Sequence, residues 1–331
     1  MTMRSGLAAA LLLTMLVGAV GNAATPRPRI GMVAYAGSEP TPRTPDGLTL
    51  VGFLRAERAL PIRGHIAYMA PPQGPAPVLK SFGRSGYDMV FAPALEARAV
   101  NTVARGFRGV RFVVIDWQLG RLFPARHARN VYPAVFRAEQ AGYRAGYLAA
   151  SMAAREGRRM ISAVAGFRFY GVTRWLVGYR AGAKKAVPRI AVRIDYSQDF
   201  ANPAKCRRVA LSQIAAGSRV VFNVAGACGL GALRAAREKG VWGVGVDVDQ
   251  SHLGPHILTS AVMRLDRGVF DTVRKFVRGK LEPGTTVYGV RNGGVELGRI
   301  SPRVPKRILR KVEDIRRRIA DGTIRVPRPR G

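Results

Sequence analysis

The sequence predicts an α/β protein with two lobes, each a parallel sheet covered by helices on both faces. Apolar runs of five or six residues alternate with helical patterns, as buried parallel strands do. This alternation occurs in two successive series. About 300 of the 331 residues follow an N-terminal leader, more than one hydrophobic core usually accommodates. We therefore expect two doubly wound lobes with a ligand cleft between them.

The leader, residues 1–23, has the composition of a secretory signal peptide. Arg4 precedes the apolar stretch Leu7–Val20, and Gly21–Ala23 offers small residues at the positions that signal peptidase inspects. The stretch of about 14 residues is too short to span a bilayer, and no later segment approaches the roughly 18 that a transmembrane helix needs. No cysteine stands directly after this stretch, where a bacterial lipid anchor would be attached. We expect export to the periplasm without a lipid anchor.

The first series begins with a strand at residues 30–35, a proline-rich loop and a helix at 48–60. Further strands are predicted at 65–69, 88–92, 110–116 and 131–136, with helices at 76–85 and 96–107.

A long amphipathic helix is predicted at residues 138–155, in which the spacing of Gly142, Gly146 and Ala149 suits close helix packing, and the second series begins after it with a strand at 160–165. Asn202 as N-cap and Pro203 at the first helical position mark another helix start. The remaining strands are predicted at 190–196, 219–225, 241–246, 257–265 and 286–290. The remaining helices are predicted at 173–186, 267–279 and 305–320, with one more that begins at 203 and another that ends at about 239.

The unit at residues 219–250 holds the main candidate site. A buried strand leads into a glycine turn (Gly226, Gly229 and Gly231), a helix follows, and a second strand delivers Asp247. Ligands of open α/β sheets bind at the carboxyl ends of the strands, so Gly226 and Asp247 should face one crevice. Asp247 could accept two hydroxyl hydrogen bonds. A dinucleotide fingerprint is less favoured, because the glycines follow GxxGxG rather than GxGxxG.

The formal charge of +34, from 54 Lys and Arg against 20 Asp and Glu, is extreme. The arginines are spread along the chain without interleaved aromatic residues, which favours a basic solvated surface over nucleic-acid binding, and attraction to an anionic membrane surface is the alternative. Four histidines and two cysteines lack metal-site spacing, so we expect no metal or other cofactor. Cys206 and Cys228 belong at one sheet edge, where a disulfide or two ordinary buried cysteines would both fit.

Several segments together resemble the basic membrane protein family, the substrate-binding components of ABC importers typified by purine nucleoside receptors. The segments are Phe136–Glu139, Ala141–Ala150, Val177–Ala183, Asp199–Lys205, Val224–Gly226 with Gly229–Gly231, Gly245–Gln250, Leu258–Ser260 and Gly293–Val295. The resemblance implies a type I periplasmic binding protein fold, in which two lobes joined by a multi-strand hinge close on one ligand.

The resemblance also implies roles for individual residues. Asp247 corresponds to the acid that holds the ribose, Gly226 to a backbone contact and Phe200 to the stacking ring of the second lobe. Two places depart from the family pattern. The acidic, Asn- and Phe-containing signature after the first strand is replaced by Ala36–Pro42, and the expected lysine is replaced by Met263, with Arg264 next to it.

Further candidates lie where strands of the first series and a loop of the second reach the cleft. Asp116 and Trp117 end one strand and Tyr35 ends another, and Tyr170 follows the strand at 160–165. Either Trp117 or Tyr35 could stack on a planar ligand, or could pack within its lobe.

We expect residues 24–136 and about 251–284 to form the N-terminal lobe, and residues 137–250 and about 285–331 the C-terminal lobe. The favoured function is a non-catalytic, monomeric binding protein that passes a nucleoside or related small polar ligand to an ABC permease. A ligand-sensing or adaptor module that docks on a membrane receptor is the alternative. A carbohydrate- or nucleoside-active hydrolase stands third, because only Asp247 with Asp199 imitates a catalytic carboxylate pair.

Overall fold

The computed structural model describes residues 26–69, 72–118 and 126–329. The predicted signal peptide lies outside them. Within the described residues, no helix is both long enough and apolar enough to cross a membrane.

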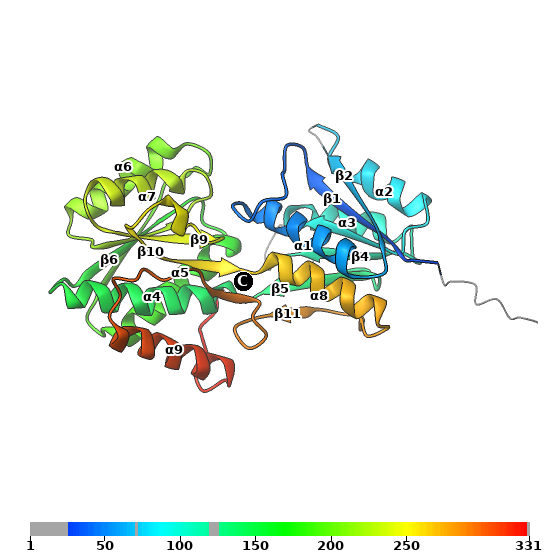
Figure 1. Ribbon diagram of the computed structural model, residues 1–331. Helices are drawn as coiled ribbons and strands as arrows, with labels where there is room; N and C mark the ends of the chain where they lie inside the picture. The colour runs from blue at the N-terminus through cyan, green and yellow to red at the C-terminus, as the bar shows by residue number, and fades with distance from the viewer. Residues whose placement is uncertain (1–25, 70–71, 119–125, 330–331) are drawn as a thin grey trace, which may run out of the picture.

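Two six-stranded sheets form the two lobes, drawn at the right and left of Figure 1. In order across the first sheet, the strands are β11 (Thr286–Tyr288), β5 (Val131–Phe136), β4 (Arg111–Ile115), β3 (Met89–Pro93), β1 (Arg29–Tyr35) and β2 (Arg63–Met69). Across the second they are β12 (Val295–Leu297), β10 (Ile257–Met263), β9 (Trp242–Asp247), β8 (Val220–Val224), β6 (Met160–Ala165) and β7 (Ala191–Tyr196). All pairings are parallel except that of β10 with β12, so two doubly wound lobes are confirmed.

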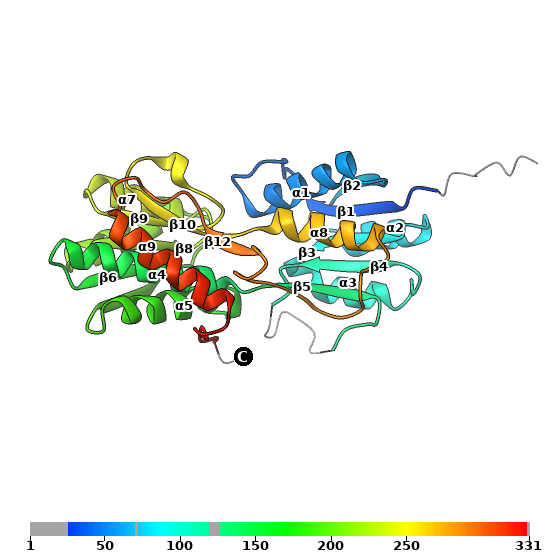
Figure 2. The same ribbon diagram turned by 60° about the horizontal axis from the view of Figure 1, so that its bottom comes forward.

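Helices cover both sheets, in the places that the apolar patterns predict (Figures 1 and 2). Those of the first lobe are α1 (Pro45–Ala59), α2 (Ala76–Arg84), α3 (Ala97–Ala104) and α8 (Leu265–Val277). Those of the second are α4 (Ala138–Arg155), α5 (Tyr170–Ala186), α6 (Pro203–Ala215), α7 (Gly229–Glu238) and α9 (Lys306–Ala320). The predicted start of α6 is confirmed, because the Asn202 side chain accepts a hydrogen bond from the backbone N–H of Ala204.

Three segments of the chain cross between the lobes and are hydrogen-bonded to one another. The crossings lie between β5 and α4, between β10 and α8, and between β11 and β12. The Arg137 N–H donates to the Tyr288 carbonyl at 2.8 Å, and the Arg264 N–H donates to the Gly294 carbonyl at 2.9 Å. Such a bundle can act as a hinge.

The strand assignment differs from the predicted boundaries at about 251 and 285. β10 lies in the second sheet and β11 in the first, so these crossings fall at Arg264 and at residues 289–294. A β-strand followed by a helix has the same apolar pattern whether or not the chain changes lobe between them. The pattern therefore locates the elements but not the crossing.

Helices α4 and α5 pack with their backbones in close contact. A Cβ atom built on Gly146 would lie 1.9 Å from the Tyr179 carbonyl oxygen, and one on Gly182 would lie 1.9 Å from that of Tyr143. The close packing predicted from the glycine spacing in α4 is confirmed, with glycines of both helices forming the contact.

Gly146→Ala is expected to lower the free energy of unfolding by about 1–3 kcal/mol, because the helices must separate to admit the methyl group. Gly109→Ala is the control, since a Cβ there meets no atom within 4 Å. Urea unfolding of both variants checks this. A Gly146→Ala variant as stable as Gly109→Ala would show that the helix contact tolerates the added atom.

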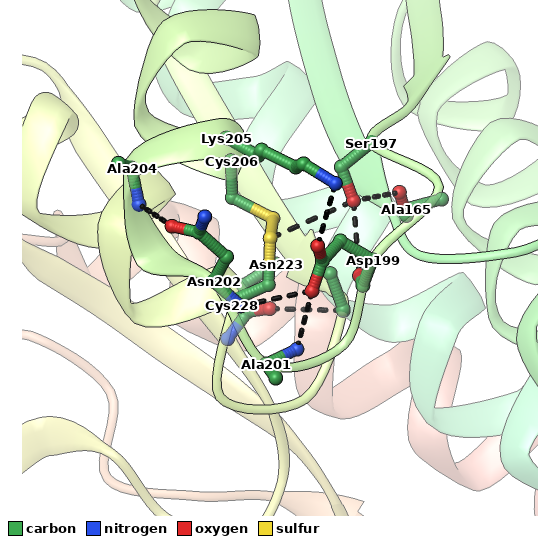
Figure 3. The surroundings of a disulfide bond; sticks show 11 residues. Ala165, Ser197, Asp199, Ala201, Asn202, Ala204, Lys205, Cys206, Asn223 and Cys228 are labelled. Atoms are coloured by element: carbon green, nitrogen blue, oxygen red, sulfur yellow. Dashed lines mark hydrogen bonds and ion pairs between the residues drawn. A yellow bond between two sulfur atoms is a disulfide. The ribbon is translucent and has the colours of Figure 1, made fainter.

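Cys206 and Cys228 form a disulfide, with their Cα atoms 5.5 Å apart (Figure 3). Cys206 lies in the first turn of α6 and Cys228 precedes α7. The Cys228 N–H donates to the Phe200 carbonyl at 2.9 Å. The bridge therefore ties the loop that carries Phe200 to the glycine turn. Of the two alternatives that the sequence left open, a disulfide or two ordinary buried cysteines, the structure contains the disulfide.

Reduction of this disulfide is expected to destabilise the protein by about 2–3 kcal/mol, because the bridge closes a loop of 22 residues in the unfolded chain. Urea unfolding with and without dithiothreitol measures the difference. The chain has only two cysteines, so the reductant has no other thiol pair to act on. A Cys206→Ser/Cys228→Ser variant should have the stability of the reduced protein, and dithiothreitol should not change that stability. Equal stability of the oxidised and reduced protein would contradict the prediction.

Candidate functional site

A cavity of about 340 Å³ is lined by residues of both lobes. It lies where the carboxyl ends of the two sets of parallel strands come together, the usual position for ligands of open α/β sheets. Tyr35 and Asp116 reach it from the first lobe, and Gly226 and Asp247 reach it from the second. These four predicted site residues, from four separate strands or strand ends, therefore share one cavity, and Phe200 is a fifth that lines it.

An ion pair between Asp116 and Arg174 bridges the two lobes at this cavity. Asp116 follows β4 of the first lobe, whereas Arg174 belongs to α5 of the second. The guanidinium donates to both carboxylate oxygens, at 2.8 and 2.7 Å, and also to the Phe136 carbonyl at 3.3 Å. Burial lowers the pKa of Arg174, but the adjacent Asp116 carboxylate reverses this, so the net shift is upward. Arg174 is already neutralised by Asp116.

Asp247 differs from Asp116 in having no partner. Within the described chain, its carboxylate makes no hydrogen bond or ion pair. Burial raises its pKa to about 6, the positive charge of Arg174 opposes the rise, and the negative charges of Asp116 and Asp46 add to it. A desolvated carboxylate without donors costs free energy. Donors from a ligand would remove that cost.

The two aspartates occupy equivalent places in the two lobes. β4 and β9 are each third in their sheets, and each leads into an aspartate with a left-handed backbone, at φ 64° for Asp116 and φ 66° for Asp247. Aspartate tolerates this conformation better than most residues. The same strained strand end therefore aims one carboxylate from each lobe at the cavity.

Aromatic rings from both lobes form part of the wall. Tyr35 lines the cavity from the first lobe and donates its hydroxyl to Glu96 at 3.1 Å. Phe200 and Phe169 line it from the second and meet edge to face, with centroids 6.1 Å apart. Phe200 is 37 % exposed, and a Cβ on Gly166 would lie 2.2 Å from its ring. A glycine thus makes room for a ring that is still open to solvent.

Comparison with known protein families supplies the decisive observation. The model of the Bmp family, described as PnrA-like ABC transporter substrate-binding proteins, matches residues 76–329. This chain belongs to the Bmp family. The expected family is thereby confirmed, and with it membership in a group of ABC substrate-binding proteins rather than a class of enzymes.

Curated relatives agree with this assignment. The Bmp-family chain is 30 % identical over 264 residues to the ABC transporter nucleoside-binding protein BmpA of Lactococcus lactis, covering 74 % of this chain and 72 % of the relative. It is 33 % identical over 174 residues to basic membrane protein D of Borreliella burgdorferi, covering 51 % and 50 %.

Solved structures confirm the type I periplasmic binding protein fold. An ABC solute-binding protein of Aeropyrum pernix superimposes with a TM-score of 0.76 at 20 % identity, covering 92 % of this chain and 94 % of the other. One from Conexibacter woesei gives a TM-score of 0.72 at 22 % identity, covering 91 % and 99 %. At these identities the likeness describes the fold alone.

Two predicted site residues of the Bmp-family protein do not line the cavity. Trp117 is 6 % exposed and packs in the core of the first lobe, against the ring of His127. Tyr170 is the first residue of α5, while its neighbours Phe169 and Gly171 line the cavity instead. In both cases the predicted residue is adjacent in sequence to one that lines the cavity, and the local backbone turns its side chain elsewhere.

Two further acids, Asp199 and Asp249, have structural partners outside the cavity. Asp199 binds Lys205 at 2.8 Å and accepts from two backbone N–H groups, which lowers its pKa to about 2. It is absent from the cavity lining, so it does not pair with Asp247 as a catalytic carboxylate would. Asp249 accepts a hydrogen bond from the Ser251 N–H at 3.1 Å.

Four polar residues of the cavity escaped prediction: Arg174, Gln118, Asp46 and Thr49. Arg174 is one of 54 basic residues, and nothing local distinguishes it from the others. Asp46 has the signature of an ordinary acid in the first turn of a helix. The neighbouring Arg264 turns to Asp266 and Glu296 at the hinge, whereas Met263 lines the cavity.

The raised pKa of Asp247 predicts a pH-dependent stability in the absence of ligand. Asp247 ionises less readily in the folded state than in the unfolded state, where its pKa is about 3.9. The loss of stability that its buried charge causes is therefore absent below about pH 3.9 and complete above about pH 6. Asp247→Asn removes the charge and therefore this loss of stability, and asparagine also tolerates the left-handed backbone at this position. The variant should gain stability over the wild type as pH rises from about 4 to 6, measured by thermal unfolding. A stability difference that does not change with pH would contradict the shift.

Proposed function

We propose that this protein captures a nucleoside or a related small polar metabolite between its lobes and delivers it to an ABC permease of the inner membrane. The observation that carries the proposal is the unpartnered carboxylate of Asp247, beside Gly226, in a cavity lined by residues of both lobes. The relative from Lactococcus lactis that is called nucleoside-binding supports the same ligand class.

Each part of the cavity has a role in this proposal. Asp247 accepts hydrogen bonds from two neighbouring hydroxyl groups, as a sugar provides. The left-handed turn at Gly226, with φ 54°, lets the backbone approach the ligand closely. Phe200 and Tyr35 offer ring faces to a planar base. Because these groups come from different lobes, the ligand would favour the closed arrangement over an open one.

The route and the partners belong to the same proposal. The leader at residues 1–23 would export the protein to the periplasm, where it would work as a monomer without a lipid anchor. The basic surface could in addition attract it to the anionic membrane surface from which the permease is reached. A sensor that docks on a receptor would use the same cavity, and co-purification with a permease rather than with a receptor would separate the two roles.

The test is a thermal-shift screen of the mature protein against purine and pyrimidine nucleosides, free bases and sugars. The proposal expects nucleosides to raise the melting temperature in a concentration-dependent way, since a ligand that binds only the folded state stabilises it. Incubation of each hit with the protein, followed by chromatography, checks that the ligand is returned unchanged. No stabilisation by any nucleoside, or turnover of the hit, would refute the proposal.

A further inference from the structure

Acidic side chains are concentrated in the cavity of a strongly basic protein. Three carboxylates (Asp46, Asp116 and Asp247) and one guanidinium, that of Arg174, line it among the described residues. Over the whole chain, Lys and Arg outnumber Asp and Glu by 54 to 20. The cavity thus reverses the charge balance of the molecule that surrounds it.

Pairing within the protein leaves this acidic excess uncompensated. Arg174 is occupied by the bidentate ion pair with Asp116. Asp46, in the first turn of α1, makes no hydrogen bond or ion pair within the described chain, and the same holds for Asp247. Two carboxylates, one from each lobe, therefore remain for the ligand.

The two free carboxylates influence each other across the cavity. The negative charge of Asp46 contributes to the raised pKa of Asp247, although burial contributes more. Asp46 is exposed to solvent, yet desolvation raises its pKa as well. A positive charge placed near both carboxylates would stabilise the ionised form of each.

A neutral side chain in the same cavity also has an acceptor atom without a hydrogen-bond donor. Gln118 is 9 % exposed and donates its Nε2 to Asp116 at 3.0 Å, while its Oε1 has no partner. Such a buried acceptor is satisfied only by a hydrogen-bond donor. Acceptors without a protein partner therefore predominate in the cavity, on Asp46, Asp247 and Gln118, whereas the ring N–H of Trp175, which also lines it, is a donor without one.

We propose that the ligand carries a positive charge, such as a protonated ring nitrogen or an amidinium group, which lies on the Asp46 side of the cavity while Asp247 holds its hydroxyls. This inference rests on the proposed function and specifies its substrate class. An anionic ligand, such as a phosphorylated nucleotide, would face two unneutralised carboxylates and should be rejected.

The experiment compares two isomeric probes by isothermal titration calorimetry at pH 7. 1-Methyladenosine is protonated at this pH, whereas N6-methyladenosine has the same atoms in a neutral form. The inference expects 1-methyladenosine to bind at least about tenfold more tightly, since one favourable charge pair at cavity distances is worth that much.

An Asp46→Asn variant separates charge from shape. It should bring the affinities for the two probes close together without abolishing the binding of N6-methyladenosine, whereas a preference of purely steric origin would survive the substitution. Glu57→Gln, a change of equal charge on the same helix but away from the cavity lining, is the control and should keep the preference.

The outcomes distinguish this inference from the function on which it rests. Binding of both probes without preference for the charged isomer would overturn the inference and leave nucleoside capture intact. Binding of neither probe, nor of adenosine or inosine, would refute the proposed function and the inference with it. Equal loss of preference in the Glu57→Gln control would also overturn the assignment to Asp46.

Discussion

Replacing Arg174 with methionine is expected to lower the free energy of unfolding by about 3–5 kcal/mol, because it leaves the carboxylate of Asp116 buried without its counter-ion. Arg174 is 2 % exposed and Asp116 is 8 % exposed, so little water reaches the pair to replace the lost hydrogen bonds. The Phe136 carbonyl loses a donor in the same substitution. Urea unfolding of the variant at pH 7 measures the loss.

A double-mutant cycle shows whether the loss comes from the unpaired charge. Asp116→Asn removes that charge and suits the left-handed backbone at this position. The Asp116→Asn/Arg174→Met variant should therefore lose clearly less stability than the two single changes summed. Arg193→Met is the matched control, because its pair with Asp195 is more than one-third exposed on both sides and should contribute about 1 kcal/mol or less. Additive single changes would mean that the ion pair has no special role.

Asp247→Asn is expected to weaken nucleoside binding by at least about 100-fold, equivalent to roughly 3 kcal/mol, because two charge-assisted hydrogen bonds to ligand hydroxyls are lost or inverted. The amide of asparagine retains the shape and the left-handed backbone of Asp247 but presents a donor where the ligand also donates. Calorimetric titration with the nucleoside that gives the largest thermal shift measures the change.

The control for this substitution is Asp249→Asn. Asp249 lies two residues further along the chain, outside the cavity lining, and caps the Ser251 N–H. It should change stability slightly and leave the affinity within about twofold of the wild type. If the Asp247→Asn variant bound the nucleoside as tightly as the wild type, Asp247 would have no place in the site.

The sequence was sufficient to predict the fold because the apolar runs are long and regular. The inner strands of both sheets are buried on both faces, and such strands carry a continuous apolar signal. The antiparallel strand β12 was missed, since three residues after the Gly293–Gly294 turn are too few to show a period. The lobe crossings at Arg264 and at residues 289–294 were also missed, because they depend on contacts between segments far apart in the chain.

The site could be predicted only where backbone position determined side-chain direction. Asp116, Asp247, Tyr35 and Gly226 lie at strand ends, and the ends of parallel strands meet at one edge. Arg174 enters the cavity from the first turns of α5, where neither helical pattern nor composition separates it from a solvated arginine. Its role follows from the position of Asp116 in the other lobe, and only the folded structure supplies that relation.

A crystal structure of the protein with the nucleoside that gives the largest thermal shift tests the central claim most directly. We predict that the ligand lies in the cavity shared by the two lobes, with its hydroxyls within hydrogen-bond distance of the Asp247 carboxylate and its ring against Phe200. A ligand bound elsewhere, with the Asp247 carboxylate still lacking a partner in the closed protein, would contradict the claim.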